Sequence, residues 1–306
     1  MSLLYLCSGQ GTQHPAMFAR LAAEAEAQPV LNALSRRLGF DARTLETQTE
    51  IDLSDNLIAQ LLVTGHALAV RAVLADVPPE LCVGYSVGEI AACAGAGAFD
   101  AETAFDLIAA RALCMNDAAA MRGVKQSMLA VIGLSEANLR SMTATAGAEI
   151  AIVNGTDHFV LGGPSESLDA LEPQLAAKGA RTLRRLPVQV ASHTSLLAAA
   201  GPAFARVLDG IGWATPNVPV LSGIDGRIIR SKSDAVRALS EQLWRPLNFR
   251  LCLESAAEHG ATAALEIGAG RTLTRLYEEV FPEQPARAYE DFRTAAGTVK
   301  WARRHI

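Results

Sequence analysis

The sequence predicts an α/β protein whose parallel-sheet core is interrupted by a smaller unit. An apolar run at 81–83 leads into a glycine-flanked turn at 84–88, and a small-residue segment follows, which is the order strand, turn, helix. Residues 127–190 alternate as strand, helix, strand, strand, helix, strand, the ferredoxin-like order. The chain has 306 residues, half of them hydrophobic, which is enough for one large domain and one small domain. We expect a large α/β domain from 1–123 and 191–306, with a ferredoxin-like domain at 124–190.

Composition excludes several classes of protein. The net charge of -5 and the lack of a long basic run argue against a nucleic-acid partner. The five cysteines are scattered without CxxC spacing, which predicts neither a disulfide framework nor a metal site. The apolar start is short and reads as a first strand, and no uninterrupted apolar run approaches the ~20 residues of a membrane span. These features favour a cytoplasmic protein with reduced cysteines and no membrane partner.

The smaller unit is predicted from its own pattern of strands and helices. Asn154-Gly155 is a turn signal that joins two of the strands as a hairpin. Strands are expected at 127–133, 149–154, 158–163 and 181–190, and helices at 135–146 and 165–178.

The larger unit is predicted to carry most of the helices. A helix is expected at 57–73, and His66 within it is interpreted as a core residue with satisfied polar atoms. Further helices are expected at 15–39, 101–120, 196–211, 233–244 and from 247 onward, and strands at 1–6, 218–222 and 263–268.

Ser86 stands at the apex of the turn at 84–88. The GxSxG pattern between a strand and a helix is typical of a nucleophile elbow, as in an α/β-hydrolase-like core. Gly84 and Gly88 keep side chains out of the crowded turn, and the helix N-terminus favours negative charge near the serine. Taken alone, the pentapeptide is equally compatible with a chance match in a chain of 24 glycines.

Two further features need a role. Gln10 lies between two glycines after the first strand, in a loop that does not match a phosphate-binding P-loop and brings backbone close to a reacting centre. Arg111 shares one helix face with Ala104, Ile108 and Met115. A buried guanidinium needs a carboxylate from the protein or a ligand, whereas an arginine that reaches the surface needs none.

Six segments in order resemble the malonyl-CoA:acyl carrier protein transacylase family, and the resemblance covers nearly the whole chain. Each segment is weak alone, but their order and spacing are specific. The segments are Gly9-Gln10-Gly11-Thr12-Gln13, Gly84-Tyr85-Ser86-Val87-Gly88-Glu89, Arg111, Ala191-Ser192-His193, Pro246-Leu247-Asn248-Phe249, and Glu266-Ile267-Gly268-Ala269-Gly270-Arg271-Thr272-Leu273.

The resemblance implies a role for each matching residue. Ser86 is the expected nucleophile and His193 its general base, with a backbone carbonyl of Asn248 orienting the histidine. The N–H groups of Gln10 and Val87 form the expected oxyanion hole. The remaining expectations are that Arg111 binds the substrate carboxylate and that Tyr85, Met115 and Ser192 line the acyl pocket. The family usually has His where this chain has Tyr85, and Pro where it has Ser8.

The resemblance also implies the reaction. Malonyl is expected to pass from coenzyme A to the serine as an ester, and then to the phosphopantetheine thiol of an acyl carrier protein, in a ping-pong scheme without a resident cofactor. A narrower similarity is to the epsilon subunit of malonate decarboxylase. Three alternatives stay open: a trans-acting polyketide acyltransferase, a hydrolase of malonyl or methylmalonyl thioesters, and a non-catalytic subunit that docks the carrier. A basic cluster of Lys178, Arg181, Arg184 and Arg185 either steers an acidic carrier or is a solvated strand edge.

Overall fold

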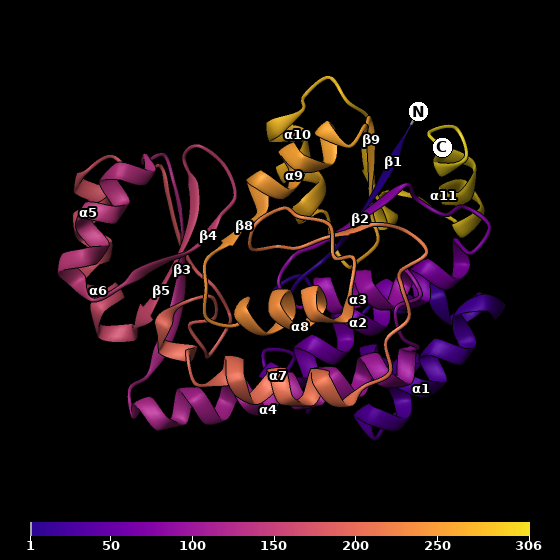
Figure 1. Cartoon of the computed structure of the whole chain (residues 1–306), viewed down its shortest axis with the longest axis horizontal. Helices are drawn as coiled ribbons and strands as arrows, with labels where there is room; N and C mark the ends of the chain where they lie inside the picture. The colour runs from indigo at the N-terminus through magenta and orange to yellow at the C-terminus, as the bar shows by residue number, and fades with distance from the viewer. Residues whose placement is uncertain (1) are drawn as a thin grey trace.

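The computed structural model describes residues 2–306 and contains two five-stranded sheets (Figure 1). Sheet A is parallel throughout, in the order β10-β9-β1-β2-β7. The carboxyl ends of parallel strands meet at one edge, where ligands of open α/β sheets bind. The strands are β1 (Leu3–Cys7), β2 (Leu81–Gly84), β7 (Val220–Leu221), β9 (Ala263–Glu266) and β10 (Ala286–Ala288).

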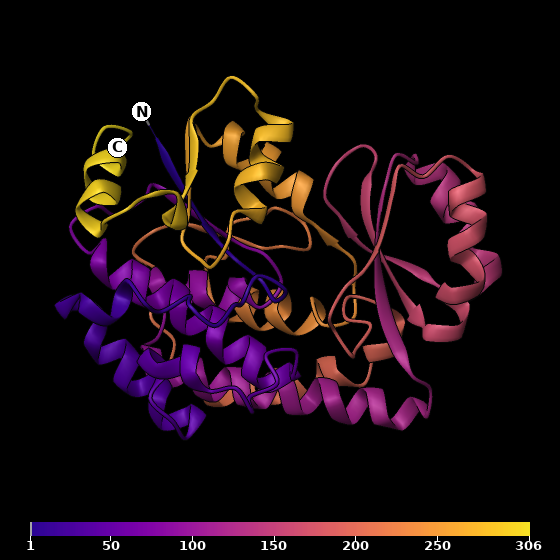
Figure 2. The ribbon, with the colours of Figure 1, turned by 180° about the vertical axis from the view of Figure 1, so that it is seen from behind.

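Helices cover both faces of sheet A because side chains of its central strand alternate between two cores. Leu3, Tyr5 and Cys7 face the larger core, and Leu4 and Leu6 face the smaller one. Figure 2 shows helices on both sides of the sheet. The larger core is formed with α1 (Gln28–Leu38), α2 (Asn56–Val73), α3 (Gly88–Gly95), α4 (Ala101–Arg122), α7 (Ala200–Gly210), α8 (Lys232–Glu241) and α11 (Ala295–Ala302), and the smaller with α9 (Phe249–Glu258) and α10 (Thr272–Val280).

Sheet B has the predicted ferredoxin-like order and one strand more. β3, β5, β4 and β6 pair antiparallel, with α5 and α6 packed on one face, and β8 adds to β4 in parallel. β8 lies outside the predicted range 124–190, so the fifth strand of sheet B comes from a later part of the chain. The elements are β3 (Gln126–Ile132), α5 (Glu136–Ala146), β4 (Glu149–Val153), β5 (His158–Pro164), α6 (Ser165–Ala177), β6 (Thr182–Arg185) and β8 (Leu247–Asn248).

Several predicted elements have different limits. The helix expected at 15–39 is an α-helix only from Gln28, with Pro29 in its first turn, where a missing N–H costs nothing. Turns and short 3-10 segments fill 15–27. The strand expected to reach residue 190 ends at Arg185. The helix expected from 247 begins at Phe249, because Leu247 and Asn248 join sheet B.

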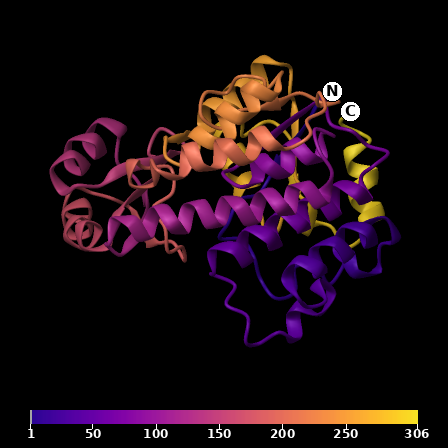
Figure 3. The same cartoon turned by 60° about the horizontal axis from the view of Figure 1, so that its bottom comes forward.

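Two helices organise the larger core. α4 runs from the helical layer of sheet A to sheet B (Figure 3). α2 satisfies the length and hydropathy of a membrane span, but 72% of that window is buried within the protein. His66 on α2 lies in the core, as predicted, between the rings of Phe18 and Tyr289. The prediction that its polar atoms are satisfied is wrong, because neither ring nitrogen has a hydrogen-bond partner among residues 2–306.

Candidate active site

Ser86 follows β2 at the carboxyl edge of sheet A, with a left-handed φ of 56°. Such a φ is uncommon for a residue with a side chain and marks local strain. The flanking glycines are a steric requirement. A Cβ at Gly84 would lie 2.1 Å from the Glu89 nitrogen, and one at Gly88 would lie 2.2 Å from the Cys7 oxygen. The sharp turn therefore forms only with glycine on both sides.

The loop after β1 packs directly on this turn. A Cβ at Gly9 would lie 2.7 Å from the carbonyl oxygen of Tyr85, so the two loops approach at van der Waals distance. Within residues 2–306, the backbone N–H groups of Gln10 and Val87 donate no hydrogen bond. Two backbone donors on adjacent loops thus remain available beside Ser86 for an oxygen atom of a ligand.

His193 is held by three hydrogen bonds and also has a left-handed φ, of 64°. Its backbone N–H donates to the Leu243 oxygen at 2.9 Å, and Nδ1 lies 2.6 Å from the Gln242 carbonyl oxygen. Because a carbonyl only accepts, Nδ1 carries the proton. Nε2 is then the acceptor for the Ser86 hydroxyl, whose Oγ lies 2.9 Å away. Ser86 and His193 are the two non-glycine residues with positive φ in the described part of the chain.

The environment keeps His193 neutral. Burial lowers its pKa to about 3, the positive charge of Arg111 adds to the shift, and the bond to Gln242 opposes it. A neutral imidazole with a free Nε2 lone pair can accept the serine proton.

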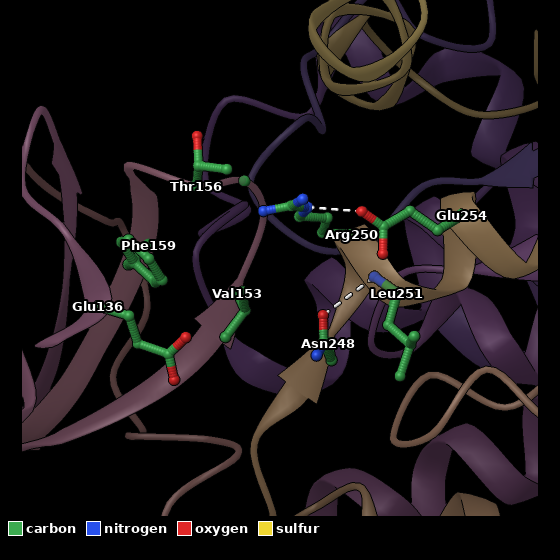
Figure 4. A pocket seen from close by; sticks show the side chains of 9 residues that line it. Glu136, Val153, Thr156, Phe159, Asn248, Arg250, Leu251 and Glu254 are labelled. Atoms are coloured by element: carbon green, nitrogen blue, oxygen red, sulfur yellow. Dashed lines mark hydrogen bonds and ion pairs between the residues drawn. The ribbon is translucent and has the colours of Figure 1, made fainter.

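The prediction that Asn248 orients His193 is wrong, because Gln242 occupies that role. Gln242 follows the last residue of α8, where helix carbonyls lack intrahelical partners and are free to accept. Asn248 instead caps α9, accepting from the Leu251 backbone at 3.0 Å (Figure 4). It lines a pocket of about 260 Å³ between sheet B and α9 that contains neither Ser86 nor His193.

Arg111 on α4 reaches the same point and is 1% exposed. Its Nη2 donates to Ser86 Oγ at 3.3 Å and its Nη1 to Gln60 Oε1 at 2.6 Å. No carboxylate among residues 2–306 forms an ion pair with it. Burial lowers its pKa to about 10, which leaves the guanidinium charged at neutral pH. The surface alternative for this arginine is thereby excluded.

A chain of side-chain amides links Arg111 to the loop after β1. Gln60 Nε2 donates to Asn56 Oδ1 at 2.8 Å, and Gln10 Nε2 donates to the same oxygen at 3.3 Å. Sequence reasoning missed Asn56, Gln60 and Gln242. The sequence could have indicated Gln60, because a polar side chain on the apolar helix expected at 57–73 needs a buried hydrogen-bond partner.

Of the three predicted pocket residues, one contacts Arg111, and the other two are the chain neighbours of Ser86 and His193. Met115 is fully buried, and its Sδ accepts from Arg111 Nη1 at 3.3 Å. The Tyr85 ring packs edge-on against Phe249 with centroids 5.0 Å apart, and burial raises the pKa of its phenol. Ser192 Oγ lies 3.4 Å from the sulfur of Met128 on β3. Met115 is therefore the one of the three that contacts Arg111, whereas Tyr85 contacts Phe249 and Ser192 contacts Met128.

The predicted basic cluster is partly neutralised within sheet B. Arg181 pairs with Asp157 at 2.5 Å, and Arg185 pairs with Asp169 at 2.6 Å and Glu172 at 3.1 Å. These pairings leave Lys178 and Arg184 as the members without an ion pair among residues 2–306. This favours the solvated strand edge over a strongly steering patch.

The fold and the serine turn agree with an α/β acyltransferase domain. The acyl transferase domain profile matches residues 4–302, so the chain belongs to the acyl transferase domain family. It is similar to the malonyl CoA-acyl carrier protein transacylase of Mycobacterium tuberculosis, with 32% identity over 290 residues that cover 92% of this chain and 94% of the relative. The predicted family resemblance is confirmed.

Solved structures agree with the predicted fold class. The malonyl CoA-acyl carrier protein transacylase of Coxiella burnetii superposes with a TM-score of 0.91 at 26% identity, covering 99% of this chain and 98% of the other. A malonyl-transacylase in complex with a type II polyketide acyl carrier protein superposes with a TM-score of 0.90 at 27% identity, covering 98% and 99%. The polyketide biosynthesis protein ThaF of Burkholderia thailandensis is 29% identical over 96% of this chain, which spans about a quarter (25%) of that protein.

Proposed function

We propose that this protein transfers a malonyl group from coenzyme A to the phosphopantetheine thiol of an acyl carrier protein. The observation that carries the proposal is Arg111, a buried cation without a carboxylate partner whose Nη2 lies 3.3 Å from Ser86 Oγ. A substrate that brings both a carboxylate and a thioester supplies a directly bound anion for Arg111 and the electrophile together. The relative from Mycobacterium tuberculosis is a malonyl CoA-acyl carrier protein transacylase, and one structural neighbour is a malonyl-transacylase in complex with an acyl carrier protein, which supports this proposal.

In the first half-reaction, Ser86 Oγ attacks the thioester carbonyl while its proton passes to His193 Nε2. The oxyanion is stabilised by the N–H groups of Gln10 and Val87, and losing one such donor costs about 2.7–4 kcal/mol of transition-state stabilisation. The carbon–sulfur bond then breaks, and His193 returns the proton to the leaving thiolate of coenzyme A. The product is malonyl-Ser86.

The second half-reaction reverses these steps with a different thiol. His193 Nε2 takes the proton from the carrier thiol, and the sulfur attacks the serine ester. The oxyanion forms at the same two amides. The carbon–oxygen bond breaks, Ser86 recovers the proton, and malonyl leaves on the carrier. One neutral histidine serves both steps because it ends each one neutral.

Arg111 provides the preference for malonyl. Its planar guanidinium can bind a carboxylate through two parallel hydrogen bonds. An acetyl group leaves the buried guanidinium without that partner, which is the situation in which a polar site discriminates most strongly. The anchored acyl group also stays in place while the thiols exchange.

The test is a transfer assay with malonyl-CoA, with and without holo-carrier protein, followed by intact-mass analysis. We expect a malonyl adduct on Ser86 without carrier and rapid, carrier-dependent loss of that adduct. Ser86→Ala is the matched control for the adduct. Fast hydrolysis without carrier-dependent transfer would identify a thioester hydrolase instead, and the absence of any adduct would overturn the proposal.

We further propose a cytoplasmic enzyme with a large domain from 1–123 and 191–306 and a small domain at 124–190. The separate core of β3 to β6 with α5 and α6 supports this division. The carrier it serves belongs to fatty-acid synthesis, to polyketide synthesis or to malonate decarboxylase. Comparing transfer rates to one purified holo-carrier from each setting distinguishes the three.

A further inference from the structure

Glu89 is a buried carboxylate that the transfer steps do not use. It lies on the first turn of α3, three residues after Ser86, and is fully buried. Its Oε2 accepts from the Gly223 backbone at 3.0 Å and from Gln242 Nε2. Its Oε1 has no hydrogen-bond partner within residues 2–306. A buried carboxylate with one free oxygen is costly to the fold, so its neighbours are informative.

Gln242 connects this carboxylate to both functional side chains. Its side-chain Oε1 accepts from Arg111 Nη2 at 3.3 Å, and its backbone oxygen accepts from His193 Nδ1 at 2.6 Å. An ionised carboxylate only accepts hydrogen bonds, so the amide must direct its nitrogen to Glu89 and its oxygen to Arg111. Glu89 therefore determines which end of the amide faces the arginine.

Arg111 and Glu89 carry opposite charges on either side of the Gln242 amide. Arg111 and Glu89 each favour the charged form of the other across the Gln242 amide. A direct ion pair would occupy the guanidinium and block an incoming carboxylate. The amide between the two groups compensates the buried positive charge and still leaves Arg111 open toward Ser86.

We propose that Glu89 is the counter-ion of Arg111 in the free enzyme and, acting through Gln242, a positioning residue that sets the preference for acyl groups carrying a carboxylate. This inference rests on the function proposed above. When malonyl binds, its carboxylate approaches Arg111 while the Glu89 carboxylate already acts on the same cation. Protonating Glu89 at its free Oε1 removes that competition and strengthens malonyl binding.

The groups around Glu89 leave it as the one that changes charge near neutrality. Burial raises the pKa of Glu89 to about 7. Burial raises the pKa of the Cys93 and Cys252 thiols, which stay neutral. Asp225 faces the same side and is paired with Arg237 at 3.0 Å. Arg111 keeps its charge in this range, because its pKa is lowered only to about 10.

The experiment measures the ratio of kcat/KM for malonyl-CoA to that for acetyl-CoA, from about pH 6 to about pH 8.5. Titration of the serine–histidine pair affects both substrates and cancels in the ratio. In the wild-type enzyme we expect the ratio to fall about fivefold as pH rises through the Glu89 pKa. In Glu89→Gln, which keeps an oxygen acceptor but carries no charge, the ratio should stay at the wild-type low-pH value.

Glu266→Gln is the matched control. Glu266 is also a fully buried carboxylate, but it accepts from Ser8 Oγ at 2.8 Å and from the Thr274 backbone at 2.8 Å instead of contacting Gln242. Its variant should keep the wild-type pH dependence of the ratio.

Three outcomes separate the inference from the proposed function. A wild-type ratio that is high but independent of pH would overturn the counter-ion role while leaving malonyl transfer intact. A Glu89→Gln ratio that follows the wild-type curve would do the same. If no malonyl transfer occurs at any pH, the proposed function fails first. Because the wild-type curve is itself decisive, poor folding of a variant does not remove the test.

Discussion

The carboxyl edge of sheet A and the interior of sheet B use buried groups in opposite ways. At the edge of sheet A, buried residues are polar, charged or strained, among them Glu89, Arg111 and His193. Inside sheet B, the core between the strands and α5 and α6 is apolar, with residues such as Leu129, Phe159 and Leu171. The difference indicates that the first region gives up stability for chemistry, whereas the second supplies stability and a wall beside the site.

Replacing His193 tests the first half of this contrast and has the largest expected effect. His193→Ala and His193→Asn should both lower the malonyl transfer rate about 10⁴-fold or more. Because asparagine tolerates a left-handed φ and alanine does not, the alanine variant should also be less stable, by about 1 kcal/mol. Stopped-flow acylation and denaturant unfolding measure the two effects. Equal stability of the two variants would contradict the strain at this position.

The two regions should differ in how much stability they lose when a glycine is replaced by alanine. In Gly88→Ala the new Cβ would lie 2.2 Å from the Cys7 oxygen, so we expect a loss of about 4 kcal/mol or more, or failure to fold. Gly179, after α6, has a positive φ, and a Cβ there would meet no atom of residues 2–306 within 4 Å, so Gly179→Ala should cost about 1 kcal/mol through backbone strain alone. Urea unfolding gives both values, and similar losses would argue against a crowded elbow.

Substituting Arg111 tests the carboxylate site while Ser86 and His193 themselves are kept. Arg111→Ala should reduce the malonyl-over-acetyl preference about a hundredfold, because the carboxylate loses its partner. Arg111→Lys keeps the charge but not the planar fork and should recover part of the preference. Competition between malonyl-CoA and acetyl-CoA measures this directly. Unchanged selectivity in the alanine variant would refute the carboxylate role.

A cavity in sheet B should have the smallest effect on chemistry. Leu171→Ala removes a fully buried side chain and should lower the free energy of unfolding by about 2–3 kcal/mol. The value of kcat/KM for malonyl-CoA should stay within about twofold of the wild type, because no hydrogen bond of the site involves α6. A tenfold loss of activity in a folded variant would show that sheet B does more than support the site.

The sequence predicted the parts of the site that carry a local signal. Gly84 and Gly88 mark the elbow, and the spacing of Arg111 along an apolar helix face marks a buried cation. The partner of His193 carries no such signal, because any residue at the end of α8 would present a carbonyl there. The kind of contact, a backbone carbonyl, was predicted correctly, but the residue that supplies it is Gln242 and not Asn248. β8 was missed for a similar reason, since two residues show no periodicity.

The strand order of sheet A also has a consequence for how the protein is made. β1 lies between β2 and β9, and β9 follows it by more than 250 residues in the chain. Residues 126–185 form their four-stranded sheet from neighbouring segments and can fold while synthesis continues. The central strand β1 can pair with β9 only when the last fifth of the chain has been synthesised. A nascent chain therefore holds Ser86 beside a sheet that stays incomplete until β9 and β10 emerge near the end of translation.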